Sequence, residues 1–426
     1  MTRQSREGGV TAPCGFTAHG VLCGIKADCT TPDLALIFSE RPCAAAGVFT
    51  KNRVQAECVR LTRAHLADGR AQAVIVNSGN ANACTGPTGA SHAERMAACT
   101  AAALDIAPED VAVCSTGVIG VPLPIEKIEG AVGVLAAGLS KEGHAAARQA
   151  ILTTDTRYKE AATQCVIDGK TVTIGAMCKG SGMIHINLGT MLAFVTTDCA
   201  ISAEMLSRAL SDSVEHTFNC VSVDGDTSTN DTLVILANGM AGNREITQED
   251  ESYRTFVAAL DDVQTVLAKK IAADGEGATK LIECIVTGAS DDATARVLAK
   301  AVISSNLVKA ALFGQDANWG RILCALGYSG ASFTPERCSI LFARADDRAY
   351  SSGADSAAPE QAEHVQPVVV FENGVPQQFD ERAVLHILGS AAVQIQVMLA
   401  DGNGSGCAWG CDLTYDYVKI NGAYRT

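Results

Sequence analysis

The amino-acid sequence predicts an α/β fold. Short apolar runs, typical of buried strands, alternate along nearly the whole chain with longer runs in which apolar residues recur at helical spacing. The chain has 426 residues and 47% of them are hydrophobic, which is enough to bury the core of two or three domains. The glycines are scattered at turns, and no repeat of solenoid length is visible. We therefore expect a globular protein of alternating strands and helices.

The elements follow from the local period of the apolar residues. In the first half they are a strand at 71–77, a helix at 92–106 that ends before Pro108, a strand at 111–117 that runs into a turn, and a helix at 125–139. In the second half they are strands at 191–197, 220–223, 232–237 and 281–288, and helices at 202–216 and 261–275.

Three further segments complete the pattern. A helix after residue 290 is expected to be capped by Ser290, with Asp291 and Asp292 in its first turn. Residues 415–420 alternate like a strand, and polar residues continue to the chain end. Residues 346–365 are small, polar and without period, so we expect a surface excursion there.

Composition excludes several classes of function. The formal net charge is −14 and no Lys/Arg cluster is present, so neither nucleic acid nor an anionic membrane is indicated as a partner. No apolar run approaches the ~20 residues that a membrane span needs. The 17 cysteines are odd in number and show no C-x-x-C spacing, which argues against a zinc module and a secreted disulfide framework. The first residues lack an apolar signal region, so we expect a cytoplasmic protein.

Two polar, glycine-bearing segments could hold chemistry or could be plain turns. "STGVIG" (115–120) follows a strand, where a turn could aim backbone N–H groups and a hydroxyl at developing negative charge. It lacks the residues of a phosphate loop. "VDGDTSTND" (223–231) could chelate Mg²⁺ or Ca²⁺, but Asx and Ser/Thr turns explain it as well, and we expect no metal site.

Two more such segments lie in the C-terminal half. "DGEGATK" (274–280) places Glu276 between two glycines, as a solvated loop carboxylate or as a positioned partner for an ammonium group. "DANWGR" (316–321) contains one of the two tryptophans, which could anchor an interface as easily as a ligand.

The boundary between Gly189 and Thr190 permits a sharper hypothesis. It could be an ordinary loop that enters a buried strand. It could also be a bond that the chain cuts itself, because an N-terminal Thr190 carries nucleophile and base in one residue: its freed amine has a pKa of roughly 8. Gly189 leaves the carbonyl open to attack. His185 close by is expected to be a bystander.

The sequence resembles the ornithine acetyltransferase family, also called glutamate N-acetyltransferase, of arginine biosynthesis. The resemblance runs from "GVTAPCGF" at Gly9 to the C-terminus. It includes "VNSGNANACTG", "STGVIG", "TTDT", "KGSGMIH", "FNCVSVDGDTSTNDT", "DANWGRILCALGYSG" and "CDLTYDYVKING".

The resemblance implies a fold and a set of site residues. It implies an α-β-β-α layered body with a smaller C-terminal α/β unit, of the self-cleaving kind with an N-terminal nucleophile. The two chains would be 1–189 and 190–426, both building one folded body and assembling as a heterotetramer. Thr190 matches the nucleophile, and Thr116 with Gly117 matches the oxyanion hole. The substrate-binding positions implied are Thr153, Lys179, Thr190, Glu276, Asn421 and Thr426.

The chain departs from the family in three places. "INLGT" stands before the expected cut where the family reads Pro-Asn-Met-Ala-Thr, so Ile186, Leu188 and Gly189 differ. We expect these changes to bear on cleavage rate rather than on chemistry. Cys220 stands where the family has Arg, and "NGAYRT" replaces "NADYRT".

The resemblance implies ping-pong acetyl transfer from N2-acetyl-L-ornithine to L-glutamate, without a cofactor. By charge complementarity, Lys179 would pair with the substrate α-carboxylate and Glu276 with the ornithine ammonium group. Some members also accept acetyl-CoA, and nothing in this sequence decides that point. Two alternatives remain: an aminopeptidase or amidase of the same architecture, with water as acceptor, and a metabolite-binding protein without activity.

Overall fold

The computed structural model describes residues 4–26, 30–185, 191–345 and 366–423. The chain forms two compact units. Unit 1 comprises Met1–Asn219 and Asp226–Leu267, and unit 2 comprises Cys220–Gly225 and Ala268–Thr426. The expected cut between residues 189 and 190 therefore falls inside unit 1, which would be built from both chains.

Unit 1 contains a nine-stranded sheet in the order β1-β6-β7-β9-β11-β3-β4-β5, with β2 paired to β3. Its strands are β1 (Gln4–Arg6), β2 (Phe16–Val21), β3 (Leu34–Phe49), β4 (Arg70–Asn80), β5 (Val111–Val118), β6 (Lys159–Ile167), β7 (Lys170–Lys179), β9 (Leu192–Thr197) and β11 (Thr232–Ala237). A short β8 (Ile184–His185) follows β7 in the chain. The long β3 joins two parts of the sheet, because residues 34–38 pair with β4 while residues 44–49 pair with β11.

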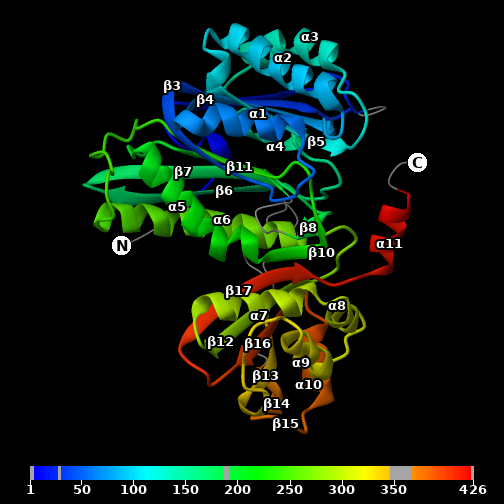
Figure 1. Ribbon diagram of the computed structural model, residues 1–426. Helices are drawn as coiled ribbons and strands as arrows, with labels where there is room; N and C mark the ends of the chain where they lie inside the picture. The colour runs from blue at the N-terminus through cyan, green and yellow to red at the C-terminus, as the bar shows by residue number, and fades with distance from the viewer. Residues whose placement is uncertain (1–3, 27–29, 186–190, 346–365, 424–426) are drawn as a thin grey trace. The chain divides into compact units, whose positions relative to one another are not determined.

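Six helices pack against the strands of unit 1 in the part of the chain that the structure describes. They are α1 (Glu57–His65), α2 (Gly86–Leu104), α3 (Ile125–Ala137), α4 (His144–Ala150), α5 (Ala203–His216) and α6 (Glu251–Ala273), the last of which continues into unit 2. In Figure 1, α2 and α3 lie above β3 and β4, whereas α5 and α6 lie on the other side of β6, β7 and β11. Unit 1 is therefore layered α-β-β-α, as the resemblance implied.

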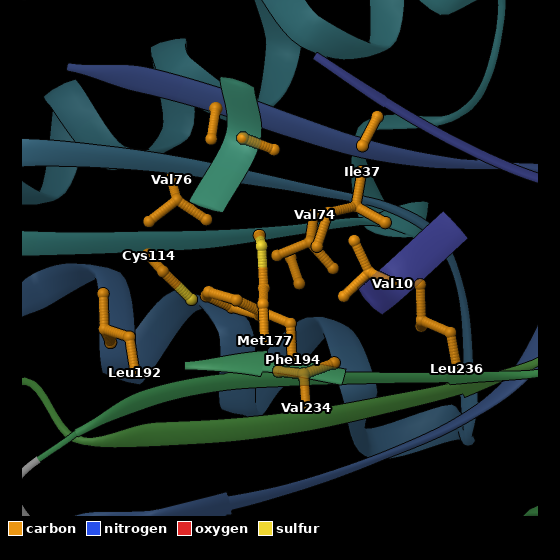
Figure 2. Packing of buried hydrophobic residues seen from close by; sticks show 14 of the residues in the cluster. Val10, Ile37, Val74, Val76, Cys114, Met177, Leu192, Phe194, Val234 and Leu236 are labelled. Carbon is orange, nitrogen blue, oxygen red and sulfur yellow. The ribbon is translucent and has the colours of Figure 1, made fainter. Parts of the chain in front are cut away.

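Two buried clusters hold these layers together. Val74 and Val76 of β4 pack with Met177, Phe194 and Val234 from the opposite strands, in the space between the two strand layers (Figure 2). Ile75 of β4 and Val113 of β5 belong instead to the cluster under the helices. Because successive side chains of a strand point to opposite faces, a strand buried on both sides reads as a continuous apolar run. "AQAVIVN" has that pattern.

Unit 2 contains a second, mixed sheet with strand order β15-β14-β13-β16-β12-β17-β10. The strands are β10 (Val221–Thr227), β12 (Leu281–Ala289), β13 (Ser339–Arg344), β14 (Val368–Glu372), β15 (Val375–Pro376), β16 (Ala392–Met398) and β17 (Gly404–Cys411). The helices are α7 (Asp292–Ser304), α8 (Asn306–Phe313), α9 (Trp319–Gly327), α10 (Glu381–Leu388) and α11 (Tyr415–Gly422). This unit is the smaller α/β part that the resemblance implied.

The predicted strands and helices are confirmed, with three corrections. Helix 92–106 begins earlier, at Gly86, and helix 261–275 begins at Glu251. The helix after residue 290 is capped by Asp291, not Ser290: the Asp291 carboxylate accepts the Thr294 N–H at 2.7 Å, a geometry that a charged acceptor favours.

The third correction concerns residues 415–420, which form helix α11 rather than a strand. The Thr414 hydroxyl accepts the Tyr417 N–H and so caps the first turn, and Asp416 lies in that turn. The alternation misled the prediction because the apolar side chains do not face a core: Tyr415 is 84% exposed and Val418 is 68% exposed.

Two other points bear on the sequence predictions. The excursion expected at 346–365 lies outside the described residues. Among the helices that the structure describes, none is long and apolar enough to cross a membrane.

Candidate active site

The turn that ends β5 requires a glycine at residue 117. Gly117 has φ +134°, and a Cβ at this position would overlap the Gly79 carbonyl carbon on the neighbouring β4. In the parallel register Ser78 pairs with Thr116 and Gly79 with Gly117. Any larger residue would therefore be strained in conformation and would also separate the two strands. The backbone after Thr116 is thus fixed by its neighbours, as a preorganised oxyanion site needs.

Asn230 ties this turn to the start of β11. Its side-chain amide donates to the Ser115 carbonyl at 2.8 Å and to the Ala81 carbonyl at 2.6 Å, and the residue is buried. A buried amide with its donors satisfied adds rigidity to the segments that it joins.

Lys179, the last residue of β7, lies beside the same turn. Its ammonium group donates to the Thr116 hydroxyl at 3.4 Å, a long contact, and the residue is only 9% exposed. In the antiparallel register with β9, Lys179 pairs with Leu192, two residues after Thr190. The structure therefore brings Thr116, Gly117 and Lys179 together beside the start of β9, the strand that follows the expected cut.

A buried carboxylate, Asp155, connects Lys179 to Thr153. Its side chain accepts hydrogen bonds from the Lys159 ammonium group at 2.7 Å, from the Gly180 N–H at 2.7 Å and from the Thr153 N–H at 3.2 Å. Burial alone would raise the Asp155 pKa, but the charges of Lys159 and Lys179 outweigh burial and lower the pKa to about 2. Asp155 therefore stays ionised and holds both segments. Sequence reasoning quoted it within "TTDT" but gave it no role.

The bond that we expect to be cut, Gly189–Thr190, lies outside the described residues, as do Ile186 and Leu188. The structure does describe Met191, the residue that follows this bond. Met191 is buried, and its carbonyl accepts the Thr232 N–H at 3.0 Å from β11. Leu192, the first residue of β9, pairs with Lys179 of β7 and with Thr232 of β11.

In unit 2 the structure brings Glu276 and Asn421 together. The Asn421 amide donates to Glu276 Oε2 at 2.8 Å and to the Tyr417 carbonyl at 3.1 Å, and Glu276 is 8% exposed. Gly277 has φ +69°, and a Cβ there would lie 2.7 Å from the Tyr417 nitrogen. The turn "DGEG" therefore packs directly on the start of α11. The remaining substrate-binding candidate, Thr426, lies outside the described residues.

The other polar segments have structural roles. Asn318 caps α9 through the Arg321 N–H, and Trp319 stacks on Phe371 with ring centroids 4.9 Å apart. Among the described residues, no three His, Cys, Asp or Glu side chains gather where they could hold a metal ion. In 223–231, the residues are divided between strand β10 and the turn that leads to β11.

Cysteines are poor candidates for a nucleophile here. Most of those that the structure describes are buried. Burial raises the pKa of Cys43 to about 12 and that of Cys58 to about 11, so these groups stay protonated near neutral pH. They act as small apolar side chains, as expected.

Sequence comparison assigns the chain to a family. Residues 17–426 match the ArgJ family. The chain belongs to the ArgJ family. It is 51% identical over 420 residues to the arginine biosynthesis bifunctional protein ArgJ of Symbiobacterium thermophilum, covering 98% of this chain and 99% of that protein. It is 49% identical over 411 residues to the corresponding ArgJ 1 protein of Clostridium acetobutylicum, covering 96% of each.

A solved structure also matches. The ornithine acetyltransferase of Mycobacterium tuberculosis, solved in complex with ornithine, is 45% identical in sequence, with a TM-score of 0.41. The match covers 43% of this chain and 97% of that one.

Proposed function

We propose that the protein transfers the acetyl group of N2-acetyl-L-ornithine to L-glutamate, giving L-ornithine and N-acetyl-L-glutamate in arginine biosynthesis. Membership of the ArgJ family over nearly the full length supports this function. The observation that carries the mechanism is the Thr116–Gly117 turn, because its conformation requires a glycine and the Lys179 ammonium group lies beside the Thr116 hydroxyl.

The proposed chemistry is ping-pong acyl transfer. The Thr190 hydroxyl, deprotonated by its own α-amine, attacks the acetyl carbonyl, and the oxyanion is stabilised by the Thr116 hydroxyl and the Gly117 N–H. Ornithine leaves with the proton, and the glutamate amine then takes the acetyl group from the threonine ester. Each step uses groups of the chain and the substrates alone, so the mechanism needs no cofactor.

Charge complementarity suggests how the substrates are recognised. Lys179 is our candidate for the α-carboxylate that both substrates share, and Thr153 is held next to it through Asp155. Glu276 is the candidate for the ornithine ammonium group, with Asn421 as its hydrogen-bonding neighbour. Thr426 remains a substrate-binding candidate from the resemblance.

We further propose that the chain cuts itself before Thr190 and that the two products stay together. β7 would lie in the first product and β9 in the second, and the two strands pair over residues 174–179 and 192–197. The resemblance implies a heterotetramer with two of each chain, in the cytoplasm. The word "bifunctional" in the names of the relatives supports acetyl-CoA as a second acetyl donor.

Intact mass measurement with N-terminal sequencing tests the nucleophile directly. We expect two chains, with the second beginning Thr190-Met191, and we expect a Thr190→Ala variant to remain a single chain without acetyl transfer. Cleavage at this bond in the Thr190→Ala variant would rule out the mechanism.

Initial-rate kinetics, in which the concentrations of both substrates are varied, then distinguish acetyl transfer from hydrolysis. An acetyl-enzyme intermediate predicts parallel lines in double-reciprocal plots. Intersecting lines would indicate direct transfer in a ternary complex. Release of acetate at the same rate with and without glutamate would indicate an amidase.

A further inference from the structure

The oxyanion hole of the proposed reaction depends on the conformation of one turn. This inference rests on the proposed function, in which the Thr116 hydroxyl and the Gly117 N–H stabilise the oxyanion. Such donors lower the barrier only when they are already oriented before the charge develops. β5, which carries the turn, is the last strand in the order of its sheet, and among the described strands it pairs with β4 alone. The turn therefore needs support from groups other than a second neighbouring strand.

The Asn230 side chain supplies such support with all of its hydrogen-bonding groups. Its amide nitrogen donates to the Ser115 carbonyl at 2.8 Å and to the Ala81 carbonyl at 2.6 Å, and it lies 3.7 Å from the Cys58 sulfur. Its amide oxygen accepts the Thr229 hydroxyl at 2.6 Å. The residue is 5% exposed. One buried side chain thus joins the end of β5, the segment after β4 and the approach to β11.

The backbone of Asn230 is itself held on both sides. Its N–H donates to the Ser228 hydroxyl at 3.2 Å, and its carbonyl accepts the hydroxyl of Thr232, the first residue of β11, at 3.0 Å. Because these bonds tie the residue to the start of a central strand, the amide offers the Ser115 carbonyl a partner at a fixed position.

A hydrogen bond to the Ser115 carbonyl sets the orientation of the next residue. The peptide bond between Ser115 and Thr116 is planar, so a fixed carbonyl fixes the plane that ends at the Thr116 Cα atom. The Thr116 hydroxyl extends from that atom, and the Gly117 N–H belongs to the following peptide. Gly117 in turn packs against the Gly79 backbone. The turn is therefore held before Thr116 by Asn230 and after it by β4.

Asparagine has the chemistry that this position requires. The two carbonyl oxygens of Ala81 and Ser115 need two donors on one short, neutral side chain. An Asp carboxylate would bring negative charge against both oxygens. A Leu side chain has a similar size but would leave both carbonyls without this partner.

We propose that Asn230 is a positioning residue of the oxyanion hole. By holding the Ser115 carbonyl, it orients the Thr116 hydroxyl and the Gly117 N–H, and it acts on acetyl transfer through the turn rather than on the substrate. Its loss should weaken stabilisation of the transition state and leave binding of the ground state unchanged. The expected signature is a lower kcat at constant KM.

The test measures initial rates of acetyl transfer by the full-length protein, expressed per chain cut before Thr190 as counted by intact mass. Asn230→Leu removes both donors, and we expect kcat to fall by about 10–100-fold, up to the loss that a misplacement of about 1 Å can cause, with KM unchanged. Asn230→Gln keeps the amide and should lose less. It is also the variant to assay if Asn230→Leu is not cut. A folded variant of either kind with the wild-type kcat would overturn the proposal.

Asn243→Leu is the matched control. Asn243 is 7% exposed, and its amide donates to the Ala200 carbonyl at 3.1 Å and to the Arg244 carbonyl at 2.8 Å, with the Cys199 sulfur at 3.7 Å. This set of bonds resembles that of Asn230, but it joins the segments that follow β9 and β11. We expect the control to lower the thermal unfolding midpoint as much as Asn230→Leu does and to keep the wild-type kcat. Equal losses of kcat in the two variants would mean that kcat reports general destabilisation, which would overturn the proposal.

A double-mutant cycle shows whether Asn230 acts through the turn. In a Thr116→Ala background, the hydroxyl that Asn230 orients is already absent. Asn230→Leu should therefore reduce kcat by a smaller factor in this background than in the wild type. Factors that simply multiply would show that the two residues act independently, which would contradict the positioning role.

The outcomes separate this inference from the proposed function. If the wild-type protein does not transfer the acetyl group of acetylornithine to glutamate, the proposed function itself fails. If the wild type does so and a folded Asn230→Leu variant has the same kcat, only the positioning role is wrong, and the roles proposed for Thr116 and Gly117 stand.

Discussion

Two buried carboxylates, Asp155 in unit 1 and Glu276 in unit 2, have opposite electrostatic environments. Asp155 pairs with the Lys159 ammonium group at 2.7 Å, both side chains are fully buried, and its pKa is lowered to about 2. Glu276 is nearly as buried, but it accepts a hydrogen bond from the neutral Asn421 amide, and within the described parts of the chain it forms no ion pair.

This difference separates a structural charge from a charge that can serve a ligand. The negative charge of Asp155 is already compensated by two lysines of the protein, so it holds backbone segments in place. Among the residues that the structure describes, no cation pairs with the negative charge of Glu276, and a buried unpaired charge is costly unless a partner arrives. We infer that a cationic ligand group would be that partner, which fits the ornithine side chain of the proposed reaction.

The largest expected effect comes from neutralising Asp155, whose charge is compensated by lysines. Asp155→Asn leaves the Lys159 ammonium group buried without its counter-ion, which should lower the free energy of unfolding by about 3–5 kcal/mol at pH 7. The double variant Asp155→Asn/Lys159→Met removes both charges and should recover most of this loss. A single variant as stable as wild type would show that the pair is not needed for folding.

The same pair predicts a pH window. The folded-state pKa of Asp155, about 2, lies below its ordinary value of 3.8. Its contribution to stability is therefore fully present above about pH 4 and is lost as the pH falls from there toward 2. The stability difference between wild type and Asp155→Asn should stay constant from pH 7 to pH 5 and shrink below pH 4, as measured by denaturant unfolding at each pH.

The next largest effect is expected at the turn beside Lys179. Thr116→Ala removes one oxyanion donor and should reduce kcat for acetyl transfer by about 10²–10³, with little change in KM. Thr116→Ser keeps the hydroxyl and should retain most of the rate. If Thr116→Ala raised KM and left kcat intact, this residue would bind the ground state, and the oxyanion role would be wrong.

Most strands and helices were predictable from the sequence, because each depends mainly on residues that are close together in the chain. Val74 and Ile75 alternate between two buried faces, and the strand that contains them was readable from its apolar run. Helix α11 was missed because the apolar residues at 415–420 alternate like those of a strand, although they do not face a core. The sign of the helix is its cap, in which the Tyr417 N–H donates a single hydrogen bond to the Thr414 hydroxyl.

The candidate site was predictable only in part, because it depends on contacts between residues that are far apart in the chain. Thr116, Gly117 and Lys179 came from the resemblance, and the structure brings them together. The contacts that support them join residues far apart in the chain, such as Asp155 with Gly180 and Asn230 with Ser115. No local pattern reports such pairs.

The smallest effect is the one that tests the comparison most directly. Glu276→Gln keeps the shape of the side chain and a hydrogen bond to Asn421 but removes the charge. Because a hydrogen bond to a charged group contributes about 1.5–3 kcal/mol, KM for acetylornithine should rise by about 10–100-fold. KM for glutamate should not change, since glutamate carries no side-chain ammonium group.

A matched variant in the same unit distinguishes charge recognition from loss of packing. Glu283 is also 8% exposed, but it already pairs with Lys269 at 2.8 Å and accepts the Trp409 indole N–H at 2.9 Å, so it resembles Asp155 rather than Glu276. Glu283→Gln should lower the thermal unfolding midpoint while leaving KM for both substrates unchanged. If Glu276→Gln behaved in the same way, Glu276 would be a structural contact of α11, and the ammonium-binding role would have to be assigned to another residue.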